Sequence, residues 1–326
     1  MSDTGTAAAA RDEVPLRVGV ALSAGSAASM AQIGVLEVLG EAGISLHSVA
    51  GTSAGAMVGA AHAAGRLAEF RAAMESLTRR RVLRLLDLAW PSEGLLHGLR
   101  ALEFVQPHLG EVIEQLAIPY AAVATDLRSG DEVMLTSGPV FDAVRASIAI
   151  PGIFKPWRVG GRLLVDGGLV NPVPVSTARA LGAEFVIAVN VLPLRNGNGA
   201  SNAMRDHLQQ IHSEGEEESD ASTLERGQEI DDELGLVEIV WHASRILAAQ
   251  IASARLRDDP PGFLLQIPVP DVGVFEFHRT AELVALGRRA TETALPGLRA
   301  ALASAIPVRR RLRRWQQRAA SLFSLS

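Results

Sequence analysis

The stretch HSVAGTSAGAMVGAAHAA, residues 47–64, decides how this chain folds. Residues 47–50 predict a short strand, and residues 54–64 predict an alanine-rich helix. The turn between them is the pentapeptide GTSAG at residues 51–55, which has the form G-x-S-x-G. A strand that leads through a tight turn into a helix is the repeating unit of α/β folds, so this stretch predicts that class.

The same turn predicts a nucleophile at Ser53. Gly51 and Gly55 flank it at two positions on either side and leave space for a strained elbow that pushes the hydroxyl out of the sheet. The following helix directs free N–H groups toward the place where an oxyanion would form. The simpler alternative is a glycine-rich turn that only joins a strand to a helix.

The segments around this stretch extend the same pattern. Residues 16–22 predict a buried strand and residues 30–43 a helix, so two strand–turn–helix units follow one another and indicate a parallel sheet covered by helices. Further strands are predicted at residues 120–126, 132–136, 162–165, 185–191 and 262–267, and further helices at residues 141–147, 175–181 and 236–257, with a mainly helical region at 66–115.

Composition is consistent with one large domain or two small ones. The chain has 326 residues, and because 48% of them are hydrophobic it can bury a sizeable core. The net charge of −5 argues against nucleic acid as a partner. Because the chain has no cysteine, disulfides, thiolate zinc sites and a cysteine nucleophile are excluded.

Three segments are expected to lie outside the packed domain. Residues 1–15 predict a disordered tail without the features of a secretory signal, and residues 195–232 predict a mobile polar and acidic insertion. Residues 306–326 form a basic, amphipathic tail. No apolar stretch is long enough to span a bilayer, so we expect a soluble cytoplasmic protein, with membrane association through the tail as an open alternative.

Asp166 is the candidate base for Ser53. It ends the predicted strand at 162–165 and precedes Gly167 and Gly168, which would let neighbouring backbone approach closely. An ordinary aspartate is a weak base near neutral pH, so this role requires surroundings that raise its proton affinity. Taken alone, such a triplet is more often a tight turn.

Histidine is a less suitable base in this chain. The later histidines lie in the polar insertion (His207 and His212), in a predicted helix (His242) and in a late loop (His278). None has the glycine-rich or turn context that would recommend it, and the serine comes too early in the chain for the usual Ser–acid–His order.

Several segments resemble the patatin-like phospholipase family, particularly its bacterial branch, in order, spacing and flanking residues. The similarity covers roughly residues 16–193, and more weakly the chain to about residue 300. Besides GTSAGA at 51–56, the segments are IGVL at 33–36, AVATDL at 122–127, SIAIPGIF at 147–154, LVDGGLVNPVP at 164–174 and LGAE at 181–184.

This resemblance implies a three-layer α/β/α fold with a mostly parallel central sheet, over residues 16–305. It implies a catalytic pair of Ser53 and Asp166, with Gly167 and Gly168 as the turn after the base, and neither metal nor cofactor. The implied activity is that of a phospholipase, lysophospholipase or esterase that cleaves acyl lipids through an acyl-enzyme. Asp166 would take the proton of Ser53 and later activate water.

One loop departs from the family pattern. The family has Gly-Gly-Gly-x-Arg-Gly after the first strand, whereas residues 24–29 here are AGSAAS, so only Gly25 is retained and Ala28 replaces the arginine. The oxyanion loop would be Ala24, Gly25 and Ser26, whose N–H groups remain available if alanine and serine adopt backbone angles that glycine favours. Loss of one oxyanion donor typically slows such an enzyme by about 100- to 1000-fold.

The altered loop leaves two hypotheses open. The first is a serine lipid acyl hydrolase, and the second is a weak or inactive protein of the same fold that binds a lipid or a partner. Nucleotide binding through residues 23–29 is disfavoured, because the loop has neither G-x-G-x-x-G nor a following lysine.

The tail also has two interpretations. Its arginines and its apolar residues, among them Trp315, fall on separate faces of a predicted helix at residues 307–326. A solvated or self-associating terminal helix is the simpler interpretation, and peripheral contact with an anionic membrane is the alternative. The oligomeric state is not predicted.

Overall fold

A computed structural model describes residues 16–87, 96–193 and 236–323, and the side chains within these ranges except at 236–238 and 307–323. The predictions for residues 1–15 and 195–232 therefore lie outside the described residues. The side-chain pattern predicted for residues 307–326 also lies outside the described side chains.

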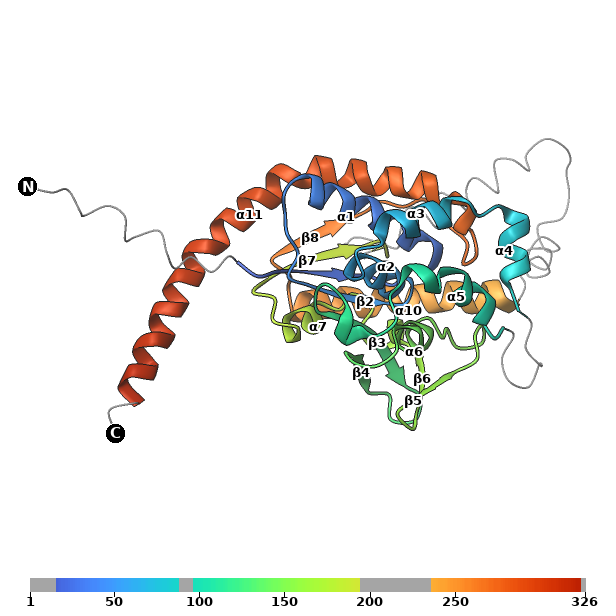
Figure 1. Ribbon diagram of the computed structural model, residues 1–326, viewed down its shortest axis with the longest axis horizontal. Helices are drawn as coiled ribbons and strands as arrows, with labels where there is room; N and C mark the ends of the chain where they lie inside the picture. Colours follow the sequence, from blue (N-terminus) through green and yellow to red (C-terminus); the bar gives the residue numbers. More distant parts are fainter. Residues whose placement is uncertain (1–15, 88–95, 194–235, 324–326) are drawn as a thin grey trace, which may run out of the picture.

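A twisted sheet forms the centre of the molecule (Figure 1). Among the described residues its strand order is β5-β6-β3-β2-β1-β7-β8, with β4 paired to β3 off this path. The strands are β1 (Val18–Leu22), β2 (Ser48–Thr52), β3 (Tyr120–Asp126), β4 (Glu132–Leu135), β5 (Trp157–Val159), β6 (Arg162–Asp166), β7 (Phe185–Asn190) and β8 (Phe263–Gln266).

Strand direction divides this sheet into two parts. The pairs β1–β2, β1–β7, β2–β3 and β7–β8 are parallel, whereas β4 and β6 run antiparallel to β3, and β5 runs antiparallel to β6. The prediction of a mostly parallel α/β sheet is confirmed. β1, β2 and β7 are buried along their whole length, as expected for strands covered on both faces.

Helices cover both faces and complete three layers. On one face of β1, the side chains of Val18, Val20 and Leu22 belong to the large core beneath α1, α2 and α11. On the other face, Ala21 packs in a smaller core with α7 and α10. The main helices are α1 (Ala31–Glu41), α2 (Ala54–Ala63), α3 (Leu67–Glu75), α4 (Arg79–Leu85), α5 (Leu99–Val105), α6 (Val140–Ser147), α7 (Val175–Ala180), α10 (Leu236–Asp258) and α11 (Thr280–Phe323).

The close approach of α1 to α11 depends on two glycines. A Cβ at Gly34 would overlap the carbonyl oxygen of Val284, and a Cβ at Gly287 would overlap that of Ala31. Figure 1 shows the first part of α11 lying along α1 and the rest extending away from the sheet. None of the described helices combines the length and the apolar composition needed to cross a bilayer.

Most predicted elements are present within a few residues of their expected bounds. β5 was not predicted, and neither was α11 as one helix, so the boundary predicted between residues 305 and 306 falls within α11. The strands predicted at residues 120–126 and 132–136 are present as β3 and β4, which pair antiparallel and form a hairpin around residues 128–131.

Candidate active site

Ser53 occupies the sharp turn between β2 and α2, and its backbone is left-handed. Its φ is 57° and its ψ is −129°, a conformation that costs a residue other than glycine on the order of 1–3 kcal/mol. The neighbouring glycines make this turn possible: a Cβ at Gly51 would lie 2.5 Å from the Cα of Ala56, and a Cβ at Gly55 would overlap the carbonyl oxygen of Ser23. The turn therefore directs the serine side chain beyond the end of β2.

The Ser53 hydroxyl donates a hydrogen bond to the Asp166 carboxylate, with 2.6 Å between Oγ and Oδ2. The sheet explains why residues far apart in sequence meet here, because β2 and β6 lie on either side of β3. Thr52 pairs with Val123, and Asp166 pairs with Ala124, so both chain segments end at the same level. Ser53 is 4% exposed and Asp166 is 6% exposed, so the pair is nearly shielded from water.

Burial changes the acid–base behaviour of this carboxylate. It raises the pKa of Asp166 from 3.8 to about 6. Two accepted hydrogen bonds oppose this rise, one from the Ser53 hydroxyl and one from the Gly168 N–H, which lies 2.7 Å from Oδ1. A Cβ at Gly167 would overlap the Val123 carbonyl oxygen, so the turn after Asp166 needs glycine there.

Two buried hydroxyl groups hold the backbone around the pair. Ser147 Oγ accepts a hydrogen bond from the Ser53 N–H at 2.8 Å and donates one to the Val123 carbonyl at 2.5 Å. Thr125 Oγ1 donates to the Asp166 carbonyl at 2.8 Å. No sequence pattern marks these positioning roles, because single serines and threonines at the ends of elements carry no distinctive spacing.

The predicted oxyanion loop lies beside the pair and lines the same pocket. Ser26 has a φ of 49°, so it adopts the left-handed backbone that residues other than glycine resist. Its Oγ donates a hydrogen bond to the Val274 carbonyl at 2.6 Å. The expectation of an available N–H at Ala24 is wrong, because this N–H donates to the Pro172 carbonyl at 2.9 Å. A Cβ at Gly25 would overlap the Val191 side chain. No described residue accepts a hydrogen bond from the N–H groups of Gly25 or Ser26. These donors are therefore available to an oxyanion.

The histidines that the structure describes do not line the pockets beside Ser53 and Asp166. His242 and His278 do not line either of the two pockets that contain Ser53. His207 and His212 lie outside the described residues. In the part of the chain that the structure describes, no cluster of three or more histidine, aspartate or glutamate side chains is placed to hold a metal ion.

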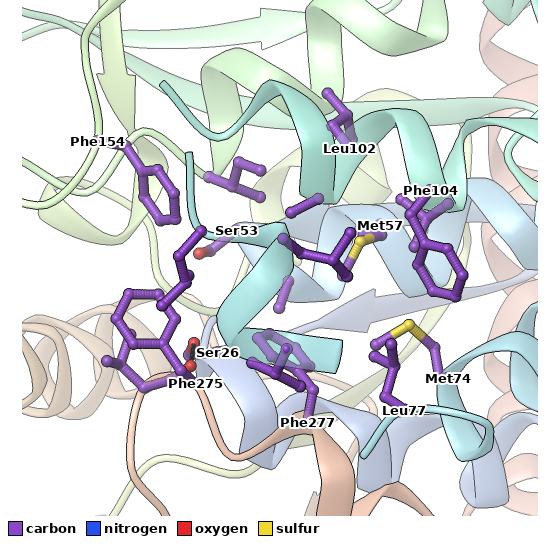
Figure 2. Close-up of a pocket in the computed structure, with 18 of the residues that line it drawn as sticks. Ser26, Ser53, Met57, Met74, Leu77, Leu102, Phe104, Phe154, Phe275 and Phe277 are labelled. Carbon is purple, nitrogen blue, oxygen red and sulfur yellow. Dashed lines mark hydrogen bonds between the residues drawn. The ribbon is translucent and has the colours of Figure 1, made fainter. Parts of the chain in front are cut away.

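An apolar cavity of about 90 Å³ extends from Ser53 toward α3, α4 and α5. Figure 2 shows Ser53 at one end with Phe154 and Phe275, and Phe104 and Met74 at the other end. Among the described residues that line it, all but two serines have aliphatic, aromatic or methionine side chains. Such a lining suits a hydrocarbon chain.

A second pocket of about 40 Å³ meets the first at Ser53. The two share Ser26, Ser53 and Ile150, while Asp166 and Arg245 line the second pocket only. The Ser53 hydroxyl therefore lies between an apolar space and a space that contains charged groups.

Comparison with known proteins identifies the relatives of this chain. The family model described as patatin-like phospholipase matches residues 20–179. An uncharacterized NTE family protein of Mycobacterium bovis is 34% identical over 328 residues, covering 86% of this chain and 91% of the relative, and one of Mycobacterium tuberculosis gives the same figures. The neuropathy target esterase sws of Drosophila melanogaster is 34% identical over 182 residues, which is 53% of this chain and 13% of that much longer protein.

The family match and the mycobacterial relative, aligned over nearly its whole length, agree with the fold described above and suggest a hydrolase that acts on lipids. The chain belongs to the patatin-like phospholipase family.

Proposed function

We propose that this protein is a serine lipid acyl hydrolase, a carboxylic ester hydrolase in which Ser53 and Asp166 form the catalytic dyad. The observation that carries the proposal is the 2.6 Å hydrogen bond between the Ser53 hydroxyl and the Asp166 carboxylate. A nucleophile paired with a base inside a pocket is the arrangement that covalent acyl transfer requires.

In the first step, Ser53 Oγ attacks the acyl carbon of the ester and Asp166 Oδ2 accepts the hydroxyl proton. The tetrahedral oxyanion receives hydrogen bonds from the N–H groups of Gly25 and Ser26. As the intermediate collapses, the bond to the alcohol breaks and the proton passes from Asp166 to the leaving oxygen. The products of this step are an alcohol and an acyl ester on Ser53.

In the second step, water replaces the alcohol. Asp166 accepts a proton from the water as its oxygen attacks the acyl carbon, and the same loop again stabilises the oxyanion. Collapse returns the proton to Ser53 Oγ and releases the fatty acid. The pKa of about 6 for Asp166 supports this role, since the group is largely ionised at neutral pH yet is a stronger base than an exposed aspartate.

The substrate class follows from the cavity beside the serine. Its apolar lining from Ser53 to Phe104 favours an acyl chain over a polar acid. We therefore assign the acyl group to this cavity and the alcohol to the pocket that contains Asp166.

The alternative is a protein that binds a lipid or a partner with little turnover. It is favoured by the altered loop, in which Ser26 holds a left-handed backbone and Ala28, buried in the 3₁₀ helix Ser26–Met30, replaces the family's arginine. The two functions differ in whether Ser53 becomes acylated.

A fluorophosphonate probe distinguishes these functions, because its phosphonyl adduct mimics the tetrahedral state and needs both nucleophile and oxyanion donors. We expect one adduct on the wild-type protein at Ser53, none on Ser53→Ala, and labelling of Asp166→Asn slowed by at least about 100-fold. Ser304→Ala, an exposed serine on α11, is the matched control and should label normally. A folded wild-type protein that does not label would favour the binding function.

A further inference from the structure

The pocket on the alcohol side of Ser53 contains a positively charged group from a distant part of the chain. Arg245, on α10, lines this pocket together with Ser53 and Asp166. Among the described residues that line it, Arg245 is the positive group and Asp166 the negative one. Residues 24–29 supply no charge, so the positive charge at this site comes from α10.

The contacts of Arg245 leave it able to bind a further acceptor. Its Nη1 lies 2.6 Å from Asp271 Oδ1, and its side chain is 22% exposed. A guanidinium group has five N–H donors, and this pair uses the donors of one nitrogen. Because the Asp271 side chain is 47% exposed, water and salt screen this ion pair, and it contributes little to stability.

Trp241, one helical turn earlier, is a second group that indicates a ligand. It lines the same pocket, and its ring centre lies 5.8 Å from the Arg245 guanidinium carbon. The residue is 7% exposed, and its indole N–H has no hydrogen-bond partner among the residues that the structure describes. A buried donor without an acceptor is unfavourable, and an oxygen-rich ligand would provide the missing acceptor.

We propose that this pocket binds the leaving group of the ester and that Arg245 selects leaving groups that carry a phosphate. This inference rests on the proposed hydrolase function and adds the chemistry of the alcohol. An anionic alcohol near the Asp166 carboxylate would be repelled unless a cation lay in the same pocket, and Arg245 supplies that cation. A guanidinium binds phosphate oxygens through paired hydrogen bonds, which a neutral glycerol cannot match.

The test compares two substrates with the same acyl chain, decanoyl-lysophosphatidic acid and monodecanoylglycerol, which differ only in the phosphate. Arg245→Gln should lower kcat/KM for the lysophosphatidic acid by about 10- to 100-fold, the range for a hydrogen bond to a charged group, and change kcat/KM for the monoacylglycerol by less than about threefold. Arg257→Gln, an exposed arginine of the same helix that lines neither pocket, is the matched control and should change neither value.

Binding to the Ser53→Ala protein separates this inference from the hydrolase function. In the Ser53→Ala background, Arg245→Gln should weaken the binding of lysophosphatidic acid by the same factor and leave the binding of the monoacylglycerol unchanged. This outcome is expected even if the wild-type protein turns over neither lipid. An equal loss of affinity for both lipids, or no loss of affinity for either, would overturn the inference but would not contradict the proposed hydrolase function. Inorganic phosphate that binds as tightly as the lysolipid, and equally through Arg245, would identify a free-phosphate site and also overturn it.

Discussion

The Asp166 carboxylate is buried, and we expect this residue to set the pH dependence of the proposed hydrolase activity. In the proposed mechanism only the ionised form can accept the Ser53 proton, so activity should be lost as pH falls through the Asp166 pKa of about 6. We expect kcat/KM for a neutral p-nitrophenyl ester to fall tenfold per pH unit below about pH 6. An acid limb near pH 4 would show that a less buried group is the base.

The same raised pKa makes the free energy of unfolding depend on pH in the direction opposite to that expected for activity. Between the ordinary value of 3.8 and about 6, the folded protein holds the Asp166 proton more tightly than the unfolded chain does. The contribution of this group to the free energy of unfolding is therefore fully present below the ordinary value and declines as pH rises through this window.

Ser26 combines an unfavourable left-handed backbone conformation with a favourable side-chain hydrogen bond. Two substitutions separate the effects of these features on stability. Ser26→Ala keeps the left-handed φ and loses the hydrogen bond to the Val274 carbonyl, so it should lower the free energy of unfolding by about 1 kcal/mol. Ser26→Gly loses the same bond but removes a left-handed strain of about 1–2 kcal/mol, so it should be at least as stable as wild type. Urea unfolding measures both, and equal destabilisation would contradict this account.

At this scale the sequence predicted which residues to examine but not the whole site. Ser53 and Asp166 could be named because glycines mark their turns. Arg245 could not, because an arginine on an amphipathic helix is usually solvated and only the packing of α10 places it in the pocket. Ser147 was visible within a matched segment, but its two hydrogen bonds depend on how α6 ends beside β3.

The junction of β1, β2 and α2 leaves no space for a side chain at Gly55. In Gly55→Ala the new methyl group would meet the carbonyl oxygens of Leu22 and Ser23, which belong to backbone and cannot rotate away. We expect a loss of about 1–3 kcal/mol in the free energy of unfolding and slower probe labelling of Ser53. Gly40→Ala is the matched control: its Cβ would meet nothing within 4 Å in α1, so a gain of about 0.5–1 kcal/mol is expected.

Under the proposed function, the helices α3, α4 and α5 should determine how long an acyl chain the apolar cavity accepts. Phe104 of α5 lies at the end far from Ser53 (Figure 2), so Phe104→Ala should lengthen the cavity. For acyl esters longer than the wild-type optimum, kcat/KM should rise about fourfold per added methylene, the value of burying about 0.8 kcal/mol. Leu83→Ala, on α4 with 65% exposure and outside the cavity, should leave the chain-length profile unchanged. A shifted optimum in both variants would argue against this assignment.

Secondary structure was predictable where one pattern dominated. The buried apolar runs of β3 and β7 are β-strand-like over their whole length. β5 has only three residues and is formed by pairing with β6, so no local signal marks it. α11 contains Pro296 and Pro307, which ordinarily suggest helix ends, yet it runs unbroken from Thr280 to Phe323.

For the molecule as a whole, contact of the basic tail with an anionic lipid surface is a hypothesis that deletion of the tail tests. Residues 307–326 contain six arginines, each worth about 1 kcal/mol near an anionic membrane. If the tail binds membranes, deleting these residues should lower partitioning onto phosphatidylglycerol vesicles by more than about 100-fold. It should leave partitioning onto phosphatidylcholine vesicles and hydrolysis of a soluble ester unchanged. Unchanged binding to both vesicles would favour the solvated or self-associating helix.

The contact between α1 and α11 has a consequence for how the protein is made. Arg288 on α11 pairs with Glu37 on α1, 251 residues earlier, and Gly34 and Gly287 let the two backbones touch. During translation, the face of α1 that contacts α11 therefore stays uncovered until all the described strands of the sheet have been synthesised, because β8 ends at Gln266 and α11 begins at Thr280. Nascent chains that stop before residue 280 should expose this face and require chaperones, whereas chains that include the first turns of α11 should become resistant to protease.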